Sequence, residues 1–168
     1  MADTLINKVA QSGIVTLDLE DFFPKEEVQV VDLKDFLFKG LILKEKEFRL
    51  ALKEYEWLSY KDKTVAIGCS TDAILPQWSY MLLTSYLSPY TTTIYYGSKE
   101  EVEYALCLEA IKNMDTSKFI NTKVVIKGCG KHTVTGSVYV ELTKKLQPVV
   151  QSLMFGEPCS TVPIYKKK

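Results

Sequence analysis

The sequence lacks most of the features that would assign a function directly. Its 168 residues include one histidine, His132, and one arginine, Arg49. No apolar run approaches the roughly 18 residues that a membrane-spanning helix needs, and the first residues show no secretory signal. The 21 basic and 21 acidic residues cancel, so no net charge attracts nucleic acid or an anionic membrane. We therefore expect a cytoplasmic protein that binds neither nucleic acid nor a membrane.

The motifs of several common enzyme classes are also missing. There is no Walker loop, no G-x-G-x-x-G and no G-x-S-x-G elbow. The chain has no C-x-x-C pair either, although it contains four cysteines: Cys69, Cys107, Cys129 and Cys159. Because cytosolic thiols stay reduced, we do not expect these cysteines to form disulfides. Packing, metal ligation and thiol chemistry remain as their roles.

From Val65 onward, short β-branched runs alternate with amphipathic stretches. This pattern predicts strands over 65–68, 91–96 and 124–127 and helices over 77–87, 99–114 and 137–146. Alternating strands and helices indicate an α/β fold with a mostly parallel central sheet and helices on both faces. Residues 1–60 are expected to form a mixed lead-in that packs on the βα core of residues 61–168, within a single domain.

Two strand–Gly–Cys–helix units in this core resemble each other. One strand ends at Gly68 and Cys69, and the other ends at Gly128 and Cys129. The helix that follows carries the pattern Y-x-x-L-T-x-x-L-x-P in both units, once a one-residue gap is placed in the connecting loop. Equivalent units would bring both cysteines to the carboxyl edge of the sheet, where open α/β folds bind ligands. The alternative is that two helices converged on one apolar pattern.

The loops around these cysteines contain further metal-ligand types. Asp72 and His132 each lie three residues past a cysteine, and Cys159 is expected to return to the same edge in a loop that proline and glycine stiffen. Three thiolates, with Asp72 or His132, could ligate zinc or an iron–sulfur cluster. The ordinary alternatives are buried cysteines, a helix-capping aspartate and a surface histidine. Cys107, inside an apolar helical stretch, is expected to be buried.

Four stretches resemble a family of uncharacterised bacterial proteins, catalogued as domain of unknown function 2480. They are INKVAQSGIVTLDLEDFFP, CSTDAILPQWSYMLL, VVIKGCG and KLQPVVQSLMFGEPCSTVPIYK, and the likeness covers nearly the whole length. His132 lies outside the matched stretches. Genes of this family often lie near iron–sulfur assembly and sulfur-mobilising genes. The resemblance therefore implies a role in iron–sulfur or sulfur handling for Cys69, Cys129 and Cys159, with iron–sulfur assembly proteins as partners.

Three hypotheses of function follow from these observations. The first is a metal or iron–sulfur binding protein whose ligands are Cys69, Cys129 and Cys159, with Asp72 or His132. The second is a thiol enzyme or sulfur carrier that uses one cysteine at a strand end, activated at a helix N-terminus. The third is a structural or interaction module whose cysteines are buried. The sequence does not decide whether the protein is an enzyme.

Overall fold

The chain folds into two compact units. The computed structural model describes residues 13–128, 130–132, 134–157 and 159–168. Unit 1 comprises Met1–Phe23 and Leu106–Lys168, and unit 2 comprises Pro24–Ala105. Unit 2 is thus inserted into the sequence of unit 1, and helix α4 (Lys99–Asn113) crosses the second boundary. That the two units make a single domain stays a prediction.

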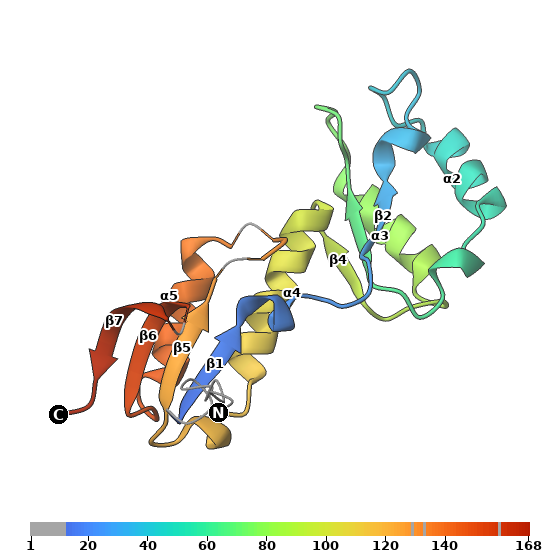
Figure 1. Ribbon diagram of the computed structural model, residues 1–168. Coiled ribbons are helices and arrows are strands. Elements are labelled where there is room, and N and C mark those ends of the chain that lie inside the picture. The colour runs from blue at the N-terminus through green and yellow to red at the C-terminus, as the bar shows by residue number, and fades with distance from the viewer. Residues whose placement is uncertain (1–12, 129, 133, 158) are drawn as a thin grey trace, which may run out of the picture. The chain divides into compact units, whose positions relative to one another are not determined.

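Unit 2 contains a three-stranded parallel sheet in the order β2-β3-β4. Parallel neighbours need a crossover connection, and two helices supply these connections (Figure 1). The elements of this unit are β2 (Gln29–Asp32), η2 (Leu33–Phe36), α2 (Glu45–Glu54), η3 (Leu58–Tyr60), β3 (Val65–Gly68), α3 (Gln77–Leu87) and β4 (Ile94–Tyr96). The apolar face of α2 is buried through Phe48 and Leu52, and α3 contributes Leu83 and Leu87 to the same core.

Unit 1 contains a four-stranded sheet in the order β1-β5-β6-β7. The first three strands are parallel, and β7 pairs antiparallel with β6. The elements of this unit, besides α4, are β1 (Ile14–Asp18), η1 (Leu19–Phe22), η4 (Ser117–Phe119), β5 (Lys123–Lys127), α5 (Gly136–Leu146), β6 (Ser152–Glu157) and β7 (Ser160–Lys166). The β5 strand is buried on both faces, as its run of Val124, Val125 and Ile126 requires.

The α/β class and the parallel strands that the sequence predicts are confirmed. Helix α3 covers the predicted residues 77–87, and α4 and α5 agree with their predictions to within one residue at each end. The parallel strands are divided between two sheets, so β3 and β5 are not neighbours. Among the described residues, no helix combines the length and the hydrophobicity needed to cross a membrane.

The two units repeat the same succession of elements. Each has a strand, a 3-10 turn, an α-helix, a second 3-10 turn, a strand, an α-helix and a strand, and unit 1 adds β7. The bounds of η4 and α5 lie 59 residues after those of η3 and α3. Asp62 and Asn121, which are also 59 apart, both have a positive φ, at 57° and 56°. Their N–H groups donate to the carbonyls of Tyr90 and Val149, at 3.0 and 2.8 Å.

This register also relates the cores of the two units. Phe48 and Leu52 of α2 correspond to Cys107 and Ile111 of α4, and all four are fully buried. The burial predicted for Cys107 is therefore confirmed. The loops from β3 to α3 and from β5 to α5 have equal lengths, so no gap is needed between them. In this gap-free register Cys69 corresponds to Gly128, one residue away from the alignment that pairs the two Gly-Cys sequences.

Candidate functional site at the carboxyl edge of unit 1

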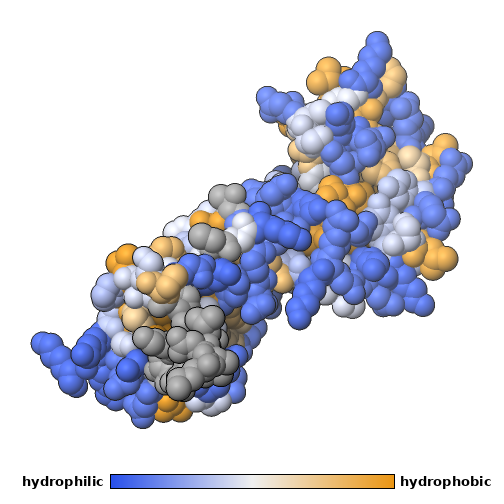
Figure 2. All heavy atoms as spheres, viewed as in Figure 1, coloured by the Kyte–Doolittle hydropathy of each residue, from blue (hydrophilic) through white to orange (hydrophobic). Residues whose placement is uncertain are grey.

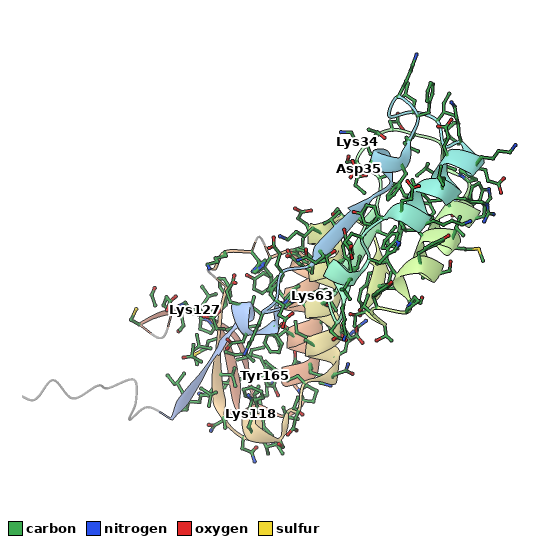
Figure 3. All side chains as sticks on the ribbon, turned by 90° about the vertical axis from the view of Figure 1, so that its right-hand side faces the viewer. Lys34, Asp35, Lys63, Lys118, Lys127 and Tyr165 are labelled. Carbon is green, nitrogen blue, oxygen red and sulfur yellow. The ribbon has the colours of Figure 1, made fainter. Side chains whose placement is uncertain are left out.

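Three parallel strands of unit 1 end at the same edge of its sheet. Asp18, the last residue of β1, is in register with Lys127, the last residue of β5. The Lys127 Nζ lies 3.8 Å from an Asp18 carboxylate oxygen and 3.8 Å from one of Glu157 at the end of β6. Lys127, which is labelled in Figure 3, thus connects three neighbouring strand ends. We call this region the unit 1 edge.

A 3-10 turn after β1 carries Glu20 to this edge. The Asp18 side chain caps the turn by accepting the Glu20 N–H at 3.0 Å, and the Phe23 N–H donates to the Glu20 carbonyl. Short polar side chains favour such local bonds to the backbone, which explains why the strand ends at an aspartate. The turn fixes the backbone of Glu20 and leaves its carboxylate free to reach the β5–α5 loop.

Glu20 holds His132 through two hydrogen bonds. Its Oε1 accepts the His132 backbone N–H at 3.0 Å, and its Oε2 lies 2.8 Å from the ring Nδ1. A carboxylate only accepts hydrogen bonds, so Nδ1 carries the proton of the neutral ring and Nε2 keeps its lone pair. Among the described residues, no hydrogen bond to Nε2 is found. The ring is therefore oriented, and Nε2 is the ring nitrogen that Glu20 does not contact.

An aromatic ring fixes the plane of His132. The Phe23 ring is stacked on the imidazole, with centroids 4.0 Å apart and an angle of 4° between the planes. Phe23 directly follows η1, so the segment that supplies Glu20 also supplies the stacking surface. The ring hydrogen bond to Glu20 and the stacking contact leave the side chain little rotational freedom. Such restraint is typical of histidines that bind metals or transfer protons.

Two glycines in the loop allow these contacts to form. A β-carbon at Gly130 would overlap the Glu20 carboxylate, and one at Gly128 would overlap the Tyr139 hydroxyl. Only glycine leaves room for these neighbours at both positions. The Gly-Cys-Gly sequence therefore lets the chain approach Glu20 on one side and α5 on the other.

The electrostatics favour an ionised Glu20. The backbone N–H of His132 is the largest cause that holds the pKa of the Glu20 carboxyl below its ordinary value of 4.5. Burial is the second cause and opposes it, and the hydrogen bond from the His132 ring lowers the pKa further. Burial, and secondly the charge of Glu20, raise the pKa of the Cys107 thiol to about 11. Cys107 is therefore protonated at neutral pH and is suited to packing rather than to chemistry.

The residues predicted as ligands are divided between the two units. Cys69 and Asp72 follow β3 in unit 2, whereas His132 and Cys159 belong to unit 1. The expectation that Cys69 and Cys129 follow strands of one sheet is therefore wrong, since β3 and β5 lie in separate sheets. Asp72 is exposed, and so is Cys159 in the turn between β6 and β7. Cys129 itself lies outside the described residues.

No complete ligand set is found within the described part of the chain. There, no three histidine, cysteine, aspartate or glutamate side chains are close enough to hold one metal ion. The pair of Glu20 and His132 is present, and it would need a further ligand. The sequence places Cys129 three residues before His132 and two residues after Lys127.

Sequence reasoning did not identify Glu20, Asp18 or Lys127 as members of this site. A second repeat in the sequence could have done so. LDLEDF at residues 17–22 and VDLKDF at residues 31–36 share the pattern D-L-x-D-F, and both fold as a strand end followed by a 3-10 turn. Glu20 and Lys34 occupy the variable position x of this pattern. Because the turn forms with lysine at that position, it does not require Glu20.

Unit 2 has a different arrangement at its own carboxyl edge. The Asp32 carboxylate accepts the N–H of Lys34 at 2.9 Å and the N–H of Ser70 at 3.0 Å. A pocket of about 360 Å³ lies beside these residues and is bordered by Cys69 and Tyr96. Glu101 accepts the Ser98 N–H at 2.7 Å, and the Ser98 hydroxyl accepts the Glu101 N–H at 3.2 Å. This reciprocal capping box occupies the start of α4, where an anion would otherwise bind.

Comparisons with known proteins place the chain in a family. The model of a family described as "Protein of unknown function (DUF2480)" matches residues 3–167, so the chain belongs to this family. Comparison with curated proteins and with solved structures gives no match.

Proposed function

We propose that this member of the DUF2480 family binds zinc or an iron–sulfur cluster at the unit 1 edge. The observation that carries the proposal is the pair of Glu20 and His132. Histidines that bind metals almost always donate their other ring N–H to a carboxylate or carbonyl, which fixes the tautomer and the direction of the lone pair. Glu20 and His132 have this arrangement, with Nε2 as the proposed ligand atom.

The topology of the sheet supports two cysteines as further ligands. Cys129 follows Lys127 by two residues, and Cys159 follows Glu157 by two residues. The Lys127 Nζ and a Glu157 carboxylate oxygen lie 3.8 Å apart. The strand ends that precede the two cysteines are therefore adjacent, and a metal would bind both cysteines as thiolates. One histidine and two thiolates would leave a fourth position open, as in catalytic zinc sites.

This proposal revises the ligand set expected from the sequence. Cys69 and Asp72 are left out because they belong to unit 2, and His132 becomes a ligand instead of an optional one. The function then requires reduced thiols, which suits a cytoplasmic protein. Iron–sulfur assembly proteins remain the partners that we propose.

Elemental analysis of protein purified without oxygen tests this proposal. We expect about one metal site per chain in the wild type, and substantial loss of metal in His132→Gln, Cys129→Ser and Cys159→Ser. Cys107→Ser is the matched control, because this buried thiol is expected to bind no metal. A wild-type protein without metal, or full metal content in all three variants, would overturn the proposal.

A second candidate function is thiol chemistry at Cys129 with His132 as the general base. It is favoured by the same oriented histidine, because a carboxylate that accepts Nδ1–H is also the arrangement of nucleophilic triads. It needs one cysteine instead of three ligands, but it gives Cys159 no role. Alkylation rates separate the two functions. Thiol chemistry predicts fast labelling of Cys129 that slows in His132→Gln and does not respond to metal, whereas a metal site predicts joint protection of Cys129 and Cys159.

A further inference from the structure

A short hairpin in unit 2 exposes an unusual number of large apolar side chains. Residues 37–44, with the sequence LFKGLILK, connect η2 to α2. Phe38 and Ile42 form an antiparallel bridge, with N–H···O distances of 2.8 and 3.2 Å. Lys39 and Gly40 at the turn both have a positive φ, of 50° and 69°. Two such residues give the tight turn that matches the twist of a hairpin, so the tip has a defined shape.

The apolar side chains of this hairpin face solvent. Phe38 is 41% exposed, Leu41 is 62% exposed and Ile42 is 59% exposed. The loop between β3 and α3 extends to the same end of unit 2 (Figure 1), and Ile74 in that loop is 98% exposed. Figure 2 shows hydrophobic and hydrophilic atoms next to each other at this end. Exposed apolar groups clustered in this way mark interaction sites more often than scattered ones do.

The charged side chains within the hairpin are both positive. Residues 37–44 include two lysines and no acidic residue. The Lys44 Nζ lies 3.5 Å from the Phe38 ring centroid, and the Lys39 Nζ lies 5.5 Å from it. Lys44 also contacts Glu47 at 3.0 Å, outside the hairpin. On the preceding η2 turn, the positive charge of Lys34 and the negative charge of Asp35 add no net charge (Figure 3). The tip is therefore apolar at its end and basic around Phe38.

We propose that this hairpin docks on an anionic lipid surface, with Leu41, Ile42 and Phe38 in the interface and the two lysines at the headgroups. Apolar side chains flanked by basic groups are the usual composition of segments that lie in a membrane interface. A stable protein interface buries roughly 800 Å² on each partner with good shape complementarity, which a hairpin tip with three apolar side chains does not offer. A lipid surface accepts a narrow tip of any shape.

This inference is independent of the proposed metal site, which lies in unit 1. The expectation that the protein binds no membrane rested on its net charge of zero. That balance is an average over the whole chain, and it does not describe the eight residues of the hairpin. A peripheral contact also needs no membrane-spanning helix.

Vesicle co-sedimentation of the full chain tests the proposal. We expect binding to vesicles of phosphatidylserine and phosphatidylcholine, weaker binding to pure phosphatidylcholine, and a further loss as salt screens the lysines. Leu41→Glu should reduce binding at least about tenfold, because it places a charge where an apolar side chain entered the interface. Leu58→Glu is the matched control, since Leu58 lies in unit 2 outside the hairpin and is 63% exposed.

Lys39→Glu separates the electrostatic part from the apolar part. It should weaken binding to the anionic vesicles and leave binding to the neutral ones unchanged. Three results would overturn the proposal. They are absence of co-sedimentation, an equal loss in Leu58→Glu and Leu41→Glu, and self-association in sedimentation velocity that Leu41→Glu abolishes. The last result would assign the tip to a second copy of the chain.

Discussion

Units 1 and 2 share a scaffold but not the side chains at its carboxyl edge. The positions of α3 and α5 differ by a constant 59 residues, and so do those of η3 and η4. At the edge, Glu20 of unit 1 corresponds to Lys34 of unit 2 through the D-L-x-D-F repeat. In the gap-free register, His132 corresponds to Ala73 and Lys127 to Gly68.

This difference separates residues that the fold needs from residues that it does not need. The buried apolar positions and the capping aspartates recur in both units, so they explain the fold. Glu20, His132 and Lys127 of unit 1 are replaced by other residue types at the matching positions of unit 2, which builds the same strand ends without them. We therefore expect these three side chains to serve the proposed function, and unit 2 becomes an internal control for each of them.

The largest expected effects test whether the two cores are equivalent. Leu83 and Leu142 occupy matching positions in α3 and α5, and both are fully buried. We expect Leu83→Ala and Leu142→Ala each to lower the free energy of unfolding by about 2–5 kcal/mol, since each leaves a cavity. Both tryptophans, Trp57 and Trp78, lie in unit 2. Urea unfolding followed by fluorescence thus reports on unit 2, and circular dichroism follows the whole chain. A loss below about 1 kcal/mol in one variant would show that the two cores are not equivalent.

The next effect concerns a position where the units differ. Gly128→Ala should destabilise the protein by about 1–3 kcal/mol, because the added methyl group would overlap the Tyr139 hydroxyl and the Phe155 ring. Unit 2 has Cys69 at the corresponding position and tolerates a side chain there. Thermal unfolding of the two proteins measures the difference.

Gly136→Ala serves as the control for Gly128→Ala. Nothing lies near a β-carbon at Gly136, the first residue of α5. This substitution should be neutral or stabilising by up to about 1 kcal/mol, because alanine favours the helix. Equal destabilisation by both substitutions would contradict the close approach at Gly128.

The sequence was sufficient to predict the helices and strands that are specified by local patterns within their own residues. Helix α3 was predicted at its observed residues because its apolar period and Pro76 define both its face and its start. The strand β2 was missed because its four residues run directly into the D-L-K-D-F turn, which gives the stronger local signal. The division into two sheets depends on pairing between distant strands, and no local pattern encodes that pairing.

The candidate site was only half predictable for the same reason. His132 was identified as a candidate because it is the sole histidine and lies near Cys129. Its partner Glu20 is 112 residues away and forms its contact only after β1 and β5 pair. Glu20 also lies among other acidic residues, so nothing in the local sequence distinguishes it as a functional residue. The comparison of the two D-L-x-D-F segments is the sequence feature that isolates it.

A smaller effect concerns the two capping aspartates. Asp18 and Asp32 cap equivalent turns, but Asp32 also accepts the Ser70 N–H. Loss of a cap costs about 1 kcal/mol, so Asp18→Ala should cost about that amount and Asp32→Ala somewhat more. Chemical denaturation of both variants gives the comparison. A larger loss in Asp18→Ala would mean that its neighbour Lys127 contributes more than the Ser70 bond does.

The smallest effect is the pH dependence that Glu20 of unit 1 contributes to stability. The pKa of Glu20 is lower in the folded chain than its ordinary value of 4.5. Its charge therefore stabilises the fold above that value, and this contribution is lost as the pH falls through the folded pKa. Between about pH 5 and about pH 3, wild type should lose slightly more stability than Glu20→Gln. Unfolding curves that stay parallel over this range would contradict an ionised Glu20 held by His132.

The most direct test of the central claim is metal affinity measured in a matched pair of variants. Glu20→Gln and Lys34→Gln change equivalent positions of the two repeats, and only the first removes a partner of His132. A cobalt titration of the metal-free protein gives both dissociation constants. We predict that Glu20→Gln weakens binding by about 10- to 100-fold, as for other residues that orient a ligating histidine, and that Lys34→Gln leaves it unchanged. Equal affinities in the two variants, or a loss confined to Lys34→Gln, would contradict a metal site at the unit 1 edge.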